Sequence, residues 1–208
     1  MGLLRILSGG QTGVDRAALD AALLAGFPCG GWCPPGRLAE DGEIPERYPL
    51  TPLPDELALA YRQEARESAR SRAGQRSASD SPTSGEGSTP EQAAPAWPGQ
   101  TKNTRQIAEL YRARTLKNVQ DSDGTVILCN GGLSGGTLLT RKLCVRERKP
   151  FLELDAEELT ALRAADAVVR FLEDHETQVL NVAGPRASGW PGGYRFALRV
   201  IGEVVSRV

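Results

Sequence analysis

The stretch ILSGGQTGVDRAALDAAL, Ile6–Leu23, decides the fold of this chain of 208 residues. A short apolar run ends at Ser8, a glycine turn follows directly, and a helix-like stretch begins almost at once. Glycine lets the backbone approach a ligand closely, and the first N–H groups of a helix are free to bind an anion. The stretch therefore predicts a strand, a turn and a helix, with a turn that can hold an anion.

Outward from this stretch, short apolar runs alternate with amphipathic stretches of helix length. Apolar runs bounded by turn residues are typical of strands buried on both faces of a parallel sheet. Apolar residues spaced by three and four indicate helices. The alternation predicts a doubly wound, three-layer α/β/α domain with a mostly parallel sheet. The expected strands are Leu3–Leu7, Thr125–Cys129, Pro150–Leu154 and Gln178–Val182, and the expected helices are Ala156–Glu173 and Tyr194–Val208.

One segment interrupts the alternation. No Leu, Ile, Val, Met or Phe occurs between Leu59 and Ile107, and Ser77–Gln100 contains five Ser, three Gly and four Pro in 24 residues. Such a composition buries too little apolar surface to offset the entropy of ordering the chain. We therefore expect a single domain over residues 1–208, interrupted at about 71–100 by a disordered or loosely attached insertion. Its flanks, Asp55–Arg72 and Thr104–Arg114, are expected to be helical. An arginine cluster in and beside the first flank favours a solvated helix face over contact with nucleic acid: Arg62, Arg66, Arg70, Arg72 and Arg76.

Composition argues against several functional classes. A formal net charge of −1 gives no global attraction to nucleic acid or to an anionic membrane. No run of about 18 apolar residues is present to span a bilayer, and the first residues are too few for a signal peptide. We therefore expect a soluble cytoplasmic protein.

Cysteine and histidine usage gives no metal signature. The four cysteines show neither CxxC spacing nor a disulfide pattern, so we expect them to be buried as small hydrophobic residues. Cys129 keeps a lesser claim to a role at the site, because it ends a strand beside a glycine loop. The single histidine, His175, excludes a His-rich zinc cluster.

Three of the expected strands end in small-residue turns that each precede a helix. These turns are Ser8–Gly13, Asn130–Thr137 and Ala183–Arg186. In an open parallel sheet the carboxyl ends of the strands share one edge, and ligands bind in the crevice outside it. Three such turns at one edge favour a site for a phosphate or another oxyanion.

The first turn, Gly9–Gly13, matches neither standard nucleotide motif. It lacks the GK[ST] ending of a P-loop, and it is not GxGxxG with a carboxylate about 20 residues further on. The spacing of Thr12 and Asp15 leaves open whether Asp15 completes a capping box or faces a ligand. Asp155 and Glu158 have the same spacing, and there we expect only a capping box. We expect the turn to serve binding more than folding.

Two polar clusters exceed what packing requires. The first is GGWCPPGRLAEDG, Gly30–Gly42, which we expect to form a rigid loop with one cation and two carboxylates. The second directly precedes a buried strand and ends in Asp123-Gly124, a pair that forms turns readily. Its polar residues outnumber the needs of one turn: Arg114, Thr115, Asn118, Asp121 and Ser122.

These motifs together are similar to those of the circularly permuted YpsA-like branch of the SLOG superfamily. They occur in the order expected of that family: SGGQTGVDRAALDAAL, GGWCPPGRLAEDG, YPL at Tyr48–Leu50, YRARTLKNVQDSDGT, SGGTLLT and NVAGPR. The resemblance covers nearly everything except roughly Leu53–Lys102. The family carries the label "putative molybdenum carrier", and its members are similar to molybdenum cofactor carrier proteins.

The resemblance implies a Rossmann-like fold with a ligand site at the strand ends. The implied ligand is the molybdenum cofactor (molybdopterin) or a related phosphorylated nucleotide, and we expect a homo-oligomer without metal-ligating residues. One departure is Pro35, which stands where the family pattern CPKGR has a lysine, so one ligand-facing cation is in question. The implied site residues are Gly9, Gly10, Gln11, Thr12, Gly13, Arg16, Arg37, Glu40, Asp41, Arg114, Thr115, Asn118, Asp121, Ser122, Gly135, Gly136, Thr137, Gly184, Pro185 and Arg186.

The resemblance leaves a carrier and an enzyme as alternatives. The superfamily includes cytokinin-activating phosphoribohydrolases with a PGGxGTxxE motif. Aligning Gly136-Thr137 with that GT places Leu139 and Thr140 where the acidic residues should be, so this loop supplies no general acid or base. Our first hypothesis is a non-catalytic carrier of a small anionic ligand. The second is a hydrolase that cleaves the N-glycosidic bond of nucleotides with Glu40 or Asp41. A nucleic-acid-binding module, the third, rests only on the arginine-rich insertion.

Arg186 is expected to be a principal charge partner of the ligand. It follows a strand end and a Gly-Pro turn, and a guanidinium binds phosphate through two parallel hydrogen bonds. The alternative is a structural role, in which Arg186 caps a carbonyl or pairs with Asp15 or Asp121.

Overall fold

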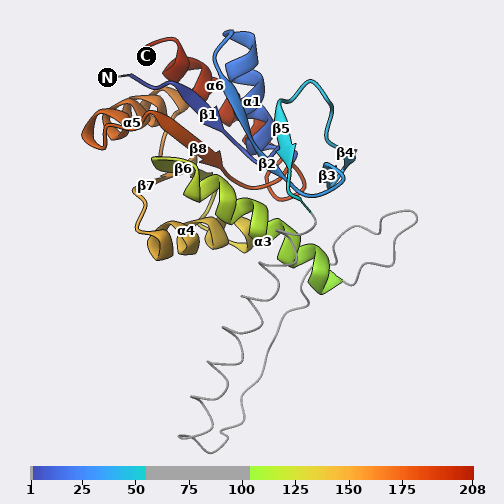
Figure 1. Ribbon diagram of the computed structural model, residues 1–208. Coiled ribbons are helices and arrows are strands. Elements are labelled where there is room, and N and C mark those ends of the chain that lie inside the picture. Colours follow the sequence, from blue (N-terminus) through green and yellow to red (C-terminus); the bar gives the residue numbers. More distant parts are fainter. Residues whose placement is uncertain (1, 55–103) are drawn as a thin grey trace, which may run out of the picture.

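A sheet of six parallel strands forms the centre of the protein, in the order β5-β2-β1-β8-β6-β7 (Figure 1). The computed structural model describes residues 2–54 and 104–208. The predicted helical flank Asp55–Arg72, the arginine cluster and the insertion at 71–100 lie outside the described residues. The strands are β1 (Arg5–Leu7), β2 (Cys29–Cys33), β5 (Leu50–Pro52), β6 (Gly124–Cys129), β7 (Phe151–Asp155) and β8 (Val179–Ala183).

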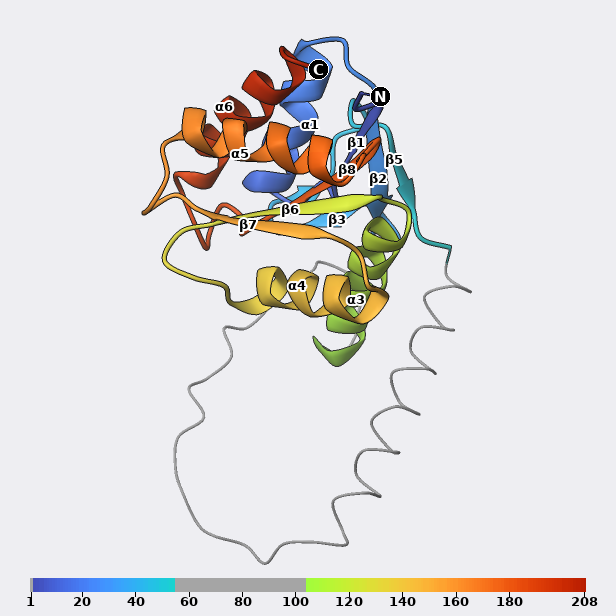
Figure 2. The same ribbon diagram turned by 90° about the vertical axis from the view of Figure 1, so that its left-hand side faces the viewer.

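Helices cover both faces of this sheet (Figure 2). On one face α6 packs against both α1 and α5, and on the other face α3 packs against α4. The protein therefore has the three-layer, doubly wound, Rossmann-like architecture that the sequence predicts. Within the described residues, no helix has the length and apolar character needed to cross a membrane. The helices are α1 (Val14–Leu24), α3 (Thr104–Gln120), α4 (Gly135–Glu147), α5 (Ala161–Asp174) and α6 (Gly193–Val205).

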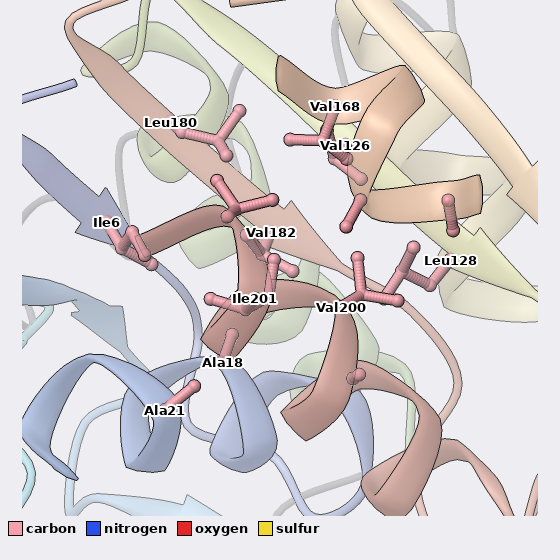
Figure 3. Packing of buried hydrophobic residues seen from close by; sticks show 14 of the residues in the cluster. Ile6, Ala18, Ala21, Val126, Leu128, Val168, Leu180, Val182, Val200 and Ile201 are labelled. Atoms are coloured by element: carbon pink, nitrogen blue, oxygen red, sulfur yellow. The ribbon is translucent and has the colours of Figure 1, made fainter. Parts of the chain in front are cut away.

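The largest core lies between the sheet and the layer of α1, α5 and α6 (Figure 3). Ala18 and Ala21 are buried on α1 and lack bulk, so this helix packs closely against Val200 and Ile201 of α6. The strands contribute fully buried branched residues to the same core. Among them, β6 is buried along its whole length. Burying one such side chain contributes roughly 1.5–3 kcal/mol. This packing holds the strand ends, and the loops after them, in fixed positions.

The structure confirms the four expected strands and the two expected helices, with shifted ends. The helix expected over Ala156–Glu173 differs most at its start, since α5 begins at Ala161. Thr160 is its N-cap and accepts a hydrogen bond from the Arg163 amide at 3.4 Å, so the predicted capping box of Asp155 and Glu158 is wrong. The helix expected over Thr104–Arg114 continues to Gln120.

The prediction of a rigid loop over Gly30–Gly42 is wrong in part. The segment begins within β2, and its second half forms a hairpin of β3 (Leu38–Ala39) and β4 (Gly42–Glu43). Residue propensities do not predict β2, because it contains Gly30 and Gly31, and glycine is rare in strands except where another backbone approaches closely. Here a Cβ at Gly31 would lie 2.1 Å from the carbonyl oxygen of Ser8, the residue that follows β1. β5 was likewise not expected.

Candidate ligand-binding site at the carboxyl edge of the sheet

The loops after β1, β6 and β8 lie at the carboxyl edge of the sheet, as the sequence predicts. β1 leads into α1 and β8 leads into α6, and these two helices pack together on one face. β6 lies beside β8 but leads into α4, which is on the opposite face (Figure 2). Neighbouring strands whose helices go to opposite faces leave a crevice outside their carboxyl ends. The carboxyl ends of β8 and β6 therefore form the topological switch point of the sheet, the position at which open α/β sheets bind ligands.

A buried ion pair lies under the first turn. Arg114 Nη1 of α3 donates to Asp15 Oδ2 of α1 at 3.2 Å, and the Gln11 amide donates to the same oxygen at 3.3 Å. Burial raises the pKa of the Asp15 carboxyl, and the Arg114 charge opposes this only in part. Arg114 reaches Asp15 because Gly9 has no side chain, since a Cβ there would lie 1.5 Å from Arg114 Nη1. The space at Gly9 is thus filled by the protein's own guanidinium.

Two further glycines of the turn also meet protein atoms. Gly10 has a φ of +73°, and a Cβ there would lie 2.3 Å from Leu50 Cδ1. Gly13 has a φ of +78°, and a Cβ there would lie 2.7 Å from the Pro185 carbonyl oxygen in the loop after β8. The turn therefore serves folding as well as any ligand, which differs from our expectation that binding would dominate.

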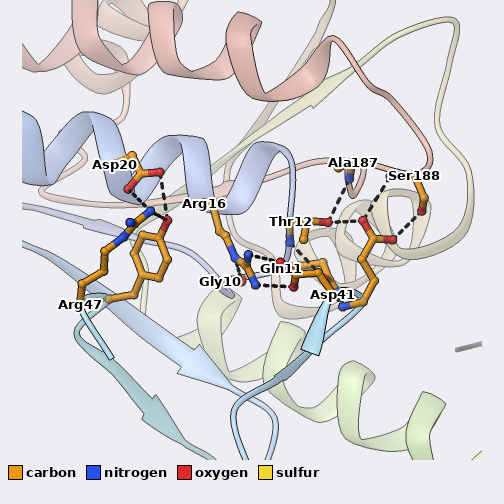
Figure 4. A network of polar contacts seen from close by, with 11 residues as sticks. Gly10, Gln11, Thr12, Arg16, Asp20, Asp41, Arg47, Ala187 and Ser188 are labelled. Atoms are coloured by element: carbon orange, nitrogen blue, oxygen red, sulfur yellow. Dashed lines mark hydrogen bonds and ion pairs between the residues drawn. The ribbon is translucent and has the colours of Figure 1, made fainter. Parts of the chain in front are cut away.

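Thr12 does not cap α1. The N-cap is Gly13, without a side-chain hydrogen bond, so the capping-box alternative for Thr12 and Asp15 is wrong. The Thr12 hydroxyl instead donates to Glu40 Oε1 and accepts from the Ala187 amide at 3.1 Å (Figure 4). Thr12 thereby joins the turn after β1 to the β3–β4 hairpin and to the loop after β8.

Glu40, at the tip of the hairpin, is the centre of this network. Its Oε2 accepts from the Ser188 hydroxyl at 2.5 Å and lies 3.4 Å from Arg186 Nε, while Oε1 also accepts from the Ser188 amide at 3.2 Å. Burial opposes ionisation of Glu40, but the hydrogen bonds from Ser188 and Thr12, with the Arg186 charge, lower its pKa. The Glu40 amide donates to Gln11 Oε1 at 2.9 Å. Glu40 is therefore an ionised carboxylate at neutral pH.

Asp41, next to Glu40, pairs with Arg16 of α1. Arg16 Nη1 and Nη2 donate to the two Asp41 carboxylate oxygens at 2.6 and 2.7 Å, and Arg16 Nε donates to the Gly10 carbonyl at 3.1 Å. These hydrogen bonds from Arg16 lower the pKa of the Asp41 carboxyl. Both carboxylates of the hairpin tip are therefore held by cationic or hydroxyl donors.

Arg186 keeps part of its guanidinium available. Among the described residues, Arg186 neither caps a carbonyl nor pairs with Asp15 or Asp121, the structural alternatives from the sequence; it pairs with Glu40 instead. Within the part of the chain that the structure describes, Arg186 pairs through Nε alone, and 38% of its side chain is exposed. Its two Nη groups can therefore donate to an oxyanion.

Arg37 has a different environment. Its guanidinium donates to four backbone carbonyls at 2.9–3.1 Å, so it organises the segment between the hairpin and β5. These acceptors belong to Ile44, Pro45, Tyr48 and Leu50. A role of Arg37 toward a ligand stays a prediction.

The third predicted cluster lies mostly on α3 and attaches that helix to the sheet. Asn118 is buried and holds both backbone groups of Trp32, accepting from its amide at 2.8 Å and donating to its carbonyl at 3.0 Å. Asp121 accepts from Trp32 Nε1 at 2.7 Å. Thr115 and Ser122 donate to carbonyls within their own helix region. Of this cluster, only Arg114 joins the polar network around the first turn.

The loop after β6 is held from inside by Asp155 at the end of β7. Its carboxylate accepts from the Glu157, Gly131 and Gly132 amides, each at 3.0 Å, and these hydrogen bonds, that from Glu157 first, lower the pKa of Asp155. Gly135 and Gly136 begin α4 and are exposed, and a Cβ on either would meet no atom within 4 Å. The first amides of α4 are thus open to a ligand, since the initial N–H groups of a helix lack intrahelical acceptors. In contrast, a Cβ at Gly184 would lie 2.6 Å from Val14 Cγ2.

The cysteines have the structural character that the sequence predicts. Cys33, Cys129 and Cys144 are buried, Cys29 is half-buried, and all four are free thiols. Burial, with the neighbouring Asp155 carboxylate, raises the pKa of Cys129 to about 11, so it is a protonated thiol at neutral pH. Among residues 2–54 and 104–208, no group of three or more His, Cys, Asp or Glu is arranged to hold a metal ion.

Two members of the network were not predicted from the sequence. Ser188 binds Glu40, and the Tyr111 hydroxyl on α3 accepts from Gln11 Nε2 at 3.5 Å and donates to the Leu38 carbonyl of the hairpin at 3.3 Å. Ser188 lies two positions beyond the predicted Arg186, which is the only signal that could have indicated it.

Comparisons with known proteins agree with this architecture. The model of the family described as "Circularly permutated YpsA SLOG family" matches residues 6–94 and 86–205. A crystal structure described as "Putative molybdenum carrier protein", from Syntrophus aciditrophicus SB, is 32% identical in sequence, with a TM-score of 0.69. The match covers 98% of this chain and 95% of the other chain. No curated protein matches the chain.

Proposed function

The chain belongs to the circularly permutated YpsA SLOG family, and from this membership we propose that it binds a phosphorylated small molecule at the carboxyl edge of its sheet and acts as a carrier of molybdenum cofactor. The solved relative named as a molybdenum carrier supports the choice of cargo. The phosphate of the cargo would be the group that the protein recognises, as the resemblance to carriers of a pterin phosphate implies.

The observation that carries the proposal is the state of Arg186. Its two Nη groups have no acceptor in the described part of the chain, and its partly exposed side chain belongs to the loop after β8, at the carboxyl edge of the sheet. A guanidinium with two free N–H edges suits the bidentate recognition of a phosphate. The exposed amides of Gly135 and Gly136, at the start of α4, supply further donors at the same edge of the sheet.

The donors at this edge suit an oxyanion. They comprise guanidinium groups, hydroxyls and backbone amides from three different loops. The proposed ligand-facing set is Thr12, Arg16, Gly135, Gly136, Thr137, Arg186 and Ser188.

The same geometry argues against Glu40 or Asp41 as the general acid of a hydrolase. A general acid at neutral pH needs a pKa near the operating pH. The pKa values of Glu40 and Asp41 are instead lowered by the hydrogen bonds that they accept, so neither carboxyl holds a proton to donate. Homo-oligomerisation and a cytoplasmic location stay predictions from the sequence.

The proposal is tested by weighing what the protein carries. Native mass spectrometry of freshly purified full-length protein, with molybdenum measured in the same sample, should reveal a bound phosphorylated species. Arg186→Lys should weaken the binding of inorganic phosphate by roughly 1.5–3 kcal/mol, the range for a hydrogen bond to a charged group. Arg170→Lys, an exposed arginine on α5, is the matched control and should bind as the wild type does.

Two results would count against the proposal. If neither a co-purifying species nor phosphate binding is found, the edge is not an oxyanion site. If the protein releases free base from nucleoside monophosphates, the hydrolase alternative replaces the carrier.

A further inference from the structure

The tip of the β3–β4 hairpin presents two carboxylates to donors of the kind that bind oxyanions. Glu40 is held by two hydroxyls, one backbone amide and one guanidinium. Asp41 is held by the fork of Arg16 through both of its carboxylate oxygens. Amides, hydroxyls and guanidinium forks are also the groups that proteins use for phosphate. The chain therefore satisfies part of its own set of anion-binding groups with its own carboxylates.

The two carboxylates come from a small element. β3 and β4 each have two residues, and their pair forms a sheet separate from the central one. Ala39 is fully buried beside Ile44, which anchors the base of the hairpin. Beyond Ala39 the tip is only partly buried or exposed, and Gly42, with a φ of +119°, has no atom within 4 Å of the position of a Cβ. The tip can therefore move while the base stays in its cluster.

We propose that the β3–β4 hairpin is a lid that competes with the ligand: Glu40 and Asp41 occupy the donors that a ligand phosphate uses, and binding displaces the hairpin tip. This inference rests on the proposed function, because it concerns the same site. A phosphate dianion outcompetes a single carboxylate for Arg186 and the two hydroxyls, whereas a singly charged ligand gains little over Glu40. The lid thereby selects ligands by charge. It pairs the Thr12 and Ser188 hydroxyls, Arg186 Nε and the Arg16 fork when no ligand is bound, while the Arg186 Nη groups stay open for the first contact with a ligand.

A static role for Glu40 makes the opposite prediction. If Glu40 only orients Arg186 and Ser188 for the ligand, removing its charge loosens both and weakens binding. If Glu40 competes with the ligand, removing its charge strengthens binding. The sign of the change therefore distinguishes the two roles.

The test is titration of the full chain with inorganic phosphate, by calorimetry, for the wild type, Glu40→Gln and Glu43→Gln. Glu43 is exposed on the same hairpin and has no side-chain partner within the described residues, so it controls for the loss of one negative charge nearby. We expect Glu40→Gln to bind phosphate about fivefold more tightly than the wild type, because binding to the wild type must first break the Arg186–Glu40 ion pair, and a partly exposed pair of this kind contributes up to about 1 kcal/mol. Glu43→Gln should bind as the wild type does.

Hydrogen exchange provides a second readout that does not depend on the variant. Saturating phosphate should speed the exchange of amides 40–42 in the wild type, because the tip leaves its partners, whereas a ligand normally slows exchange around its site. Unchanged or weaker binding by Glu40→Gln, or slower exchange at 40–42, would overturn the lid while leaving phosphate binding intact. If none of the three proteins binds phosphate, the proposed function is wrong, and the proposal of a lid is then wrong as well.

Discussion

Arg114 Nη1 lies 3.2 Å from Asp15 Oδ2, and the guanidinium reaches this buried carboxylate through the space that Gly9 leaves without a side chain. The pair joins α3 on one face of the sheet to α1 on the other. It also lies under the turn that begins the candidate site, because the Gln11 amide donates to the same Asp15 oxygen. Gly9, which the sequence motif places in the ligand site, is thus required by the fold, because its missing side chain makes room for Arg114.

Gly9→Ala should destabilise the fold strongly. The new Cβ would overlap Arg114 Nη1, so the guanidinium must move and leave Asp15 buried without its partner. We expect a loss of about 3 kcal/mol in the free energy of unfolding, the lower end of the range for breaking a buried ion pair. Urea unfolding measures it. Gly202→Ala is the control, because that glycine lies inside α6 with open space around it, and there alanine should stabilise by up to about 1 kcal/mol.

The raised pKa of Asp15 predicts a pH dependence of stability. Its folded-state pKa lies above the ordinary value of 3.8, so the folded protein holds this proton to higher pH than the unfolded chain does. Asp15 therefore contributes a stability that is present below pH 3.8 and is lost as pH rises through the folded-state pKa. Asp15→Asn cannot titrate and should not show this loss of stability. The free energy of unfolding of the wild type, relative to that of the variant, should therefore decrease as the pH is raised from acidic to neutral.

Asp41→Asn is the matched comparison for this titration and should behave oppositely. The hydrogen bonds from Arg16 lower the pKa of Asp41, so its contribution is present above its ordinary value of 3.8 and is lost as pH falls through the folded-state pKa. Unfolding in urea at a series of pH values checks both variants. Parallel pH profiles for the two would contradict the assigned directions.

The layered fold could be predicted from the sequence because its signals are local. The apolar strand before Ser8 and the helix after Gly13 are readable from consecutive residues, and the alternation of such units specifies the sheet. β2 could not be predicted, because Gly30 and Gly31 are not the β-branched residues that mark a strand. A Cβ at Gly31 would meet the Ser8 backbone, and a Cβ at Gly30 would meet the Arg5 guanidinium, so both glycines are explained only by the fold.

The sequence pointed to several residues of this polar network, among them Thr12 and Glu40, but not to their contacts. Glu40 and Ser188 are separated by 148 positions, and no local pattern indicates that one serine hydroxyl binds that carboxylate. Arg37, Arg114 and Arg186 all read as ligand-facing cations, yet their surroundings differ: carbonyls, a buried carboxylate, and a partly open edge. Which partner each arginine meets depends on tertiary packing, and only the fold supplies it.

Asn118→Ala should weaken the attachment of α3 to β2. The substitution removes the side-chain partner of the Trp32 amide and of the Trp32 carbonyl, both part-buried, at a cost of up to about 1–3 kcal/mol for each group. Thermal unfolding measures the loss. Thr115→Ala on the same helix is the control, since the Thr115 hydroxyl bonds only to the Tyr111 carbonyl in the preceding turn. If the Asn118→Ala protein had wild-type stability but bound phosphate more weakly, Asn118 would be a ligand contact and not a structural residue.

Arg37→Lys tests whether a cation in the family motif serves the ligand or the fold. The guanidinium spreads its donors over four carbonyls between Ile44 and Leu50, and an ammonium group on a single stem cannot reach them together. We expect a loss of at least about 1.5–3 kcal/mol, the value of one hydrogen bond to a charged group, measured by urea unfolding. Arg47→Lys, an exposed arginine in the same segment, should cost far less. The affinity of the folded Arg37→Lys protein for inorganic phosphate should stay unchanged, because this guanidinium is fully engaged with backbone carbonyls. Weaker phosphate binding at wild-type stability would instead establish Arg37 as a ligand contact. It would also show that residues 44–50 keep their conformation without the hydrogen bonds from Arg37.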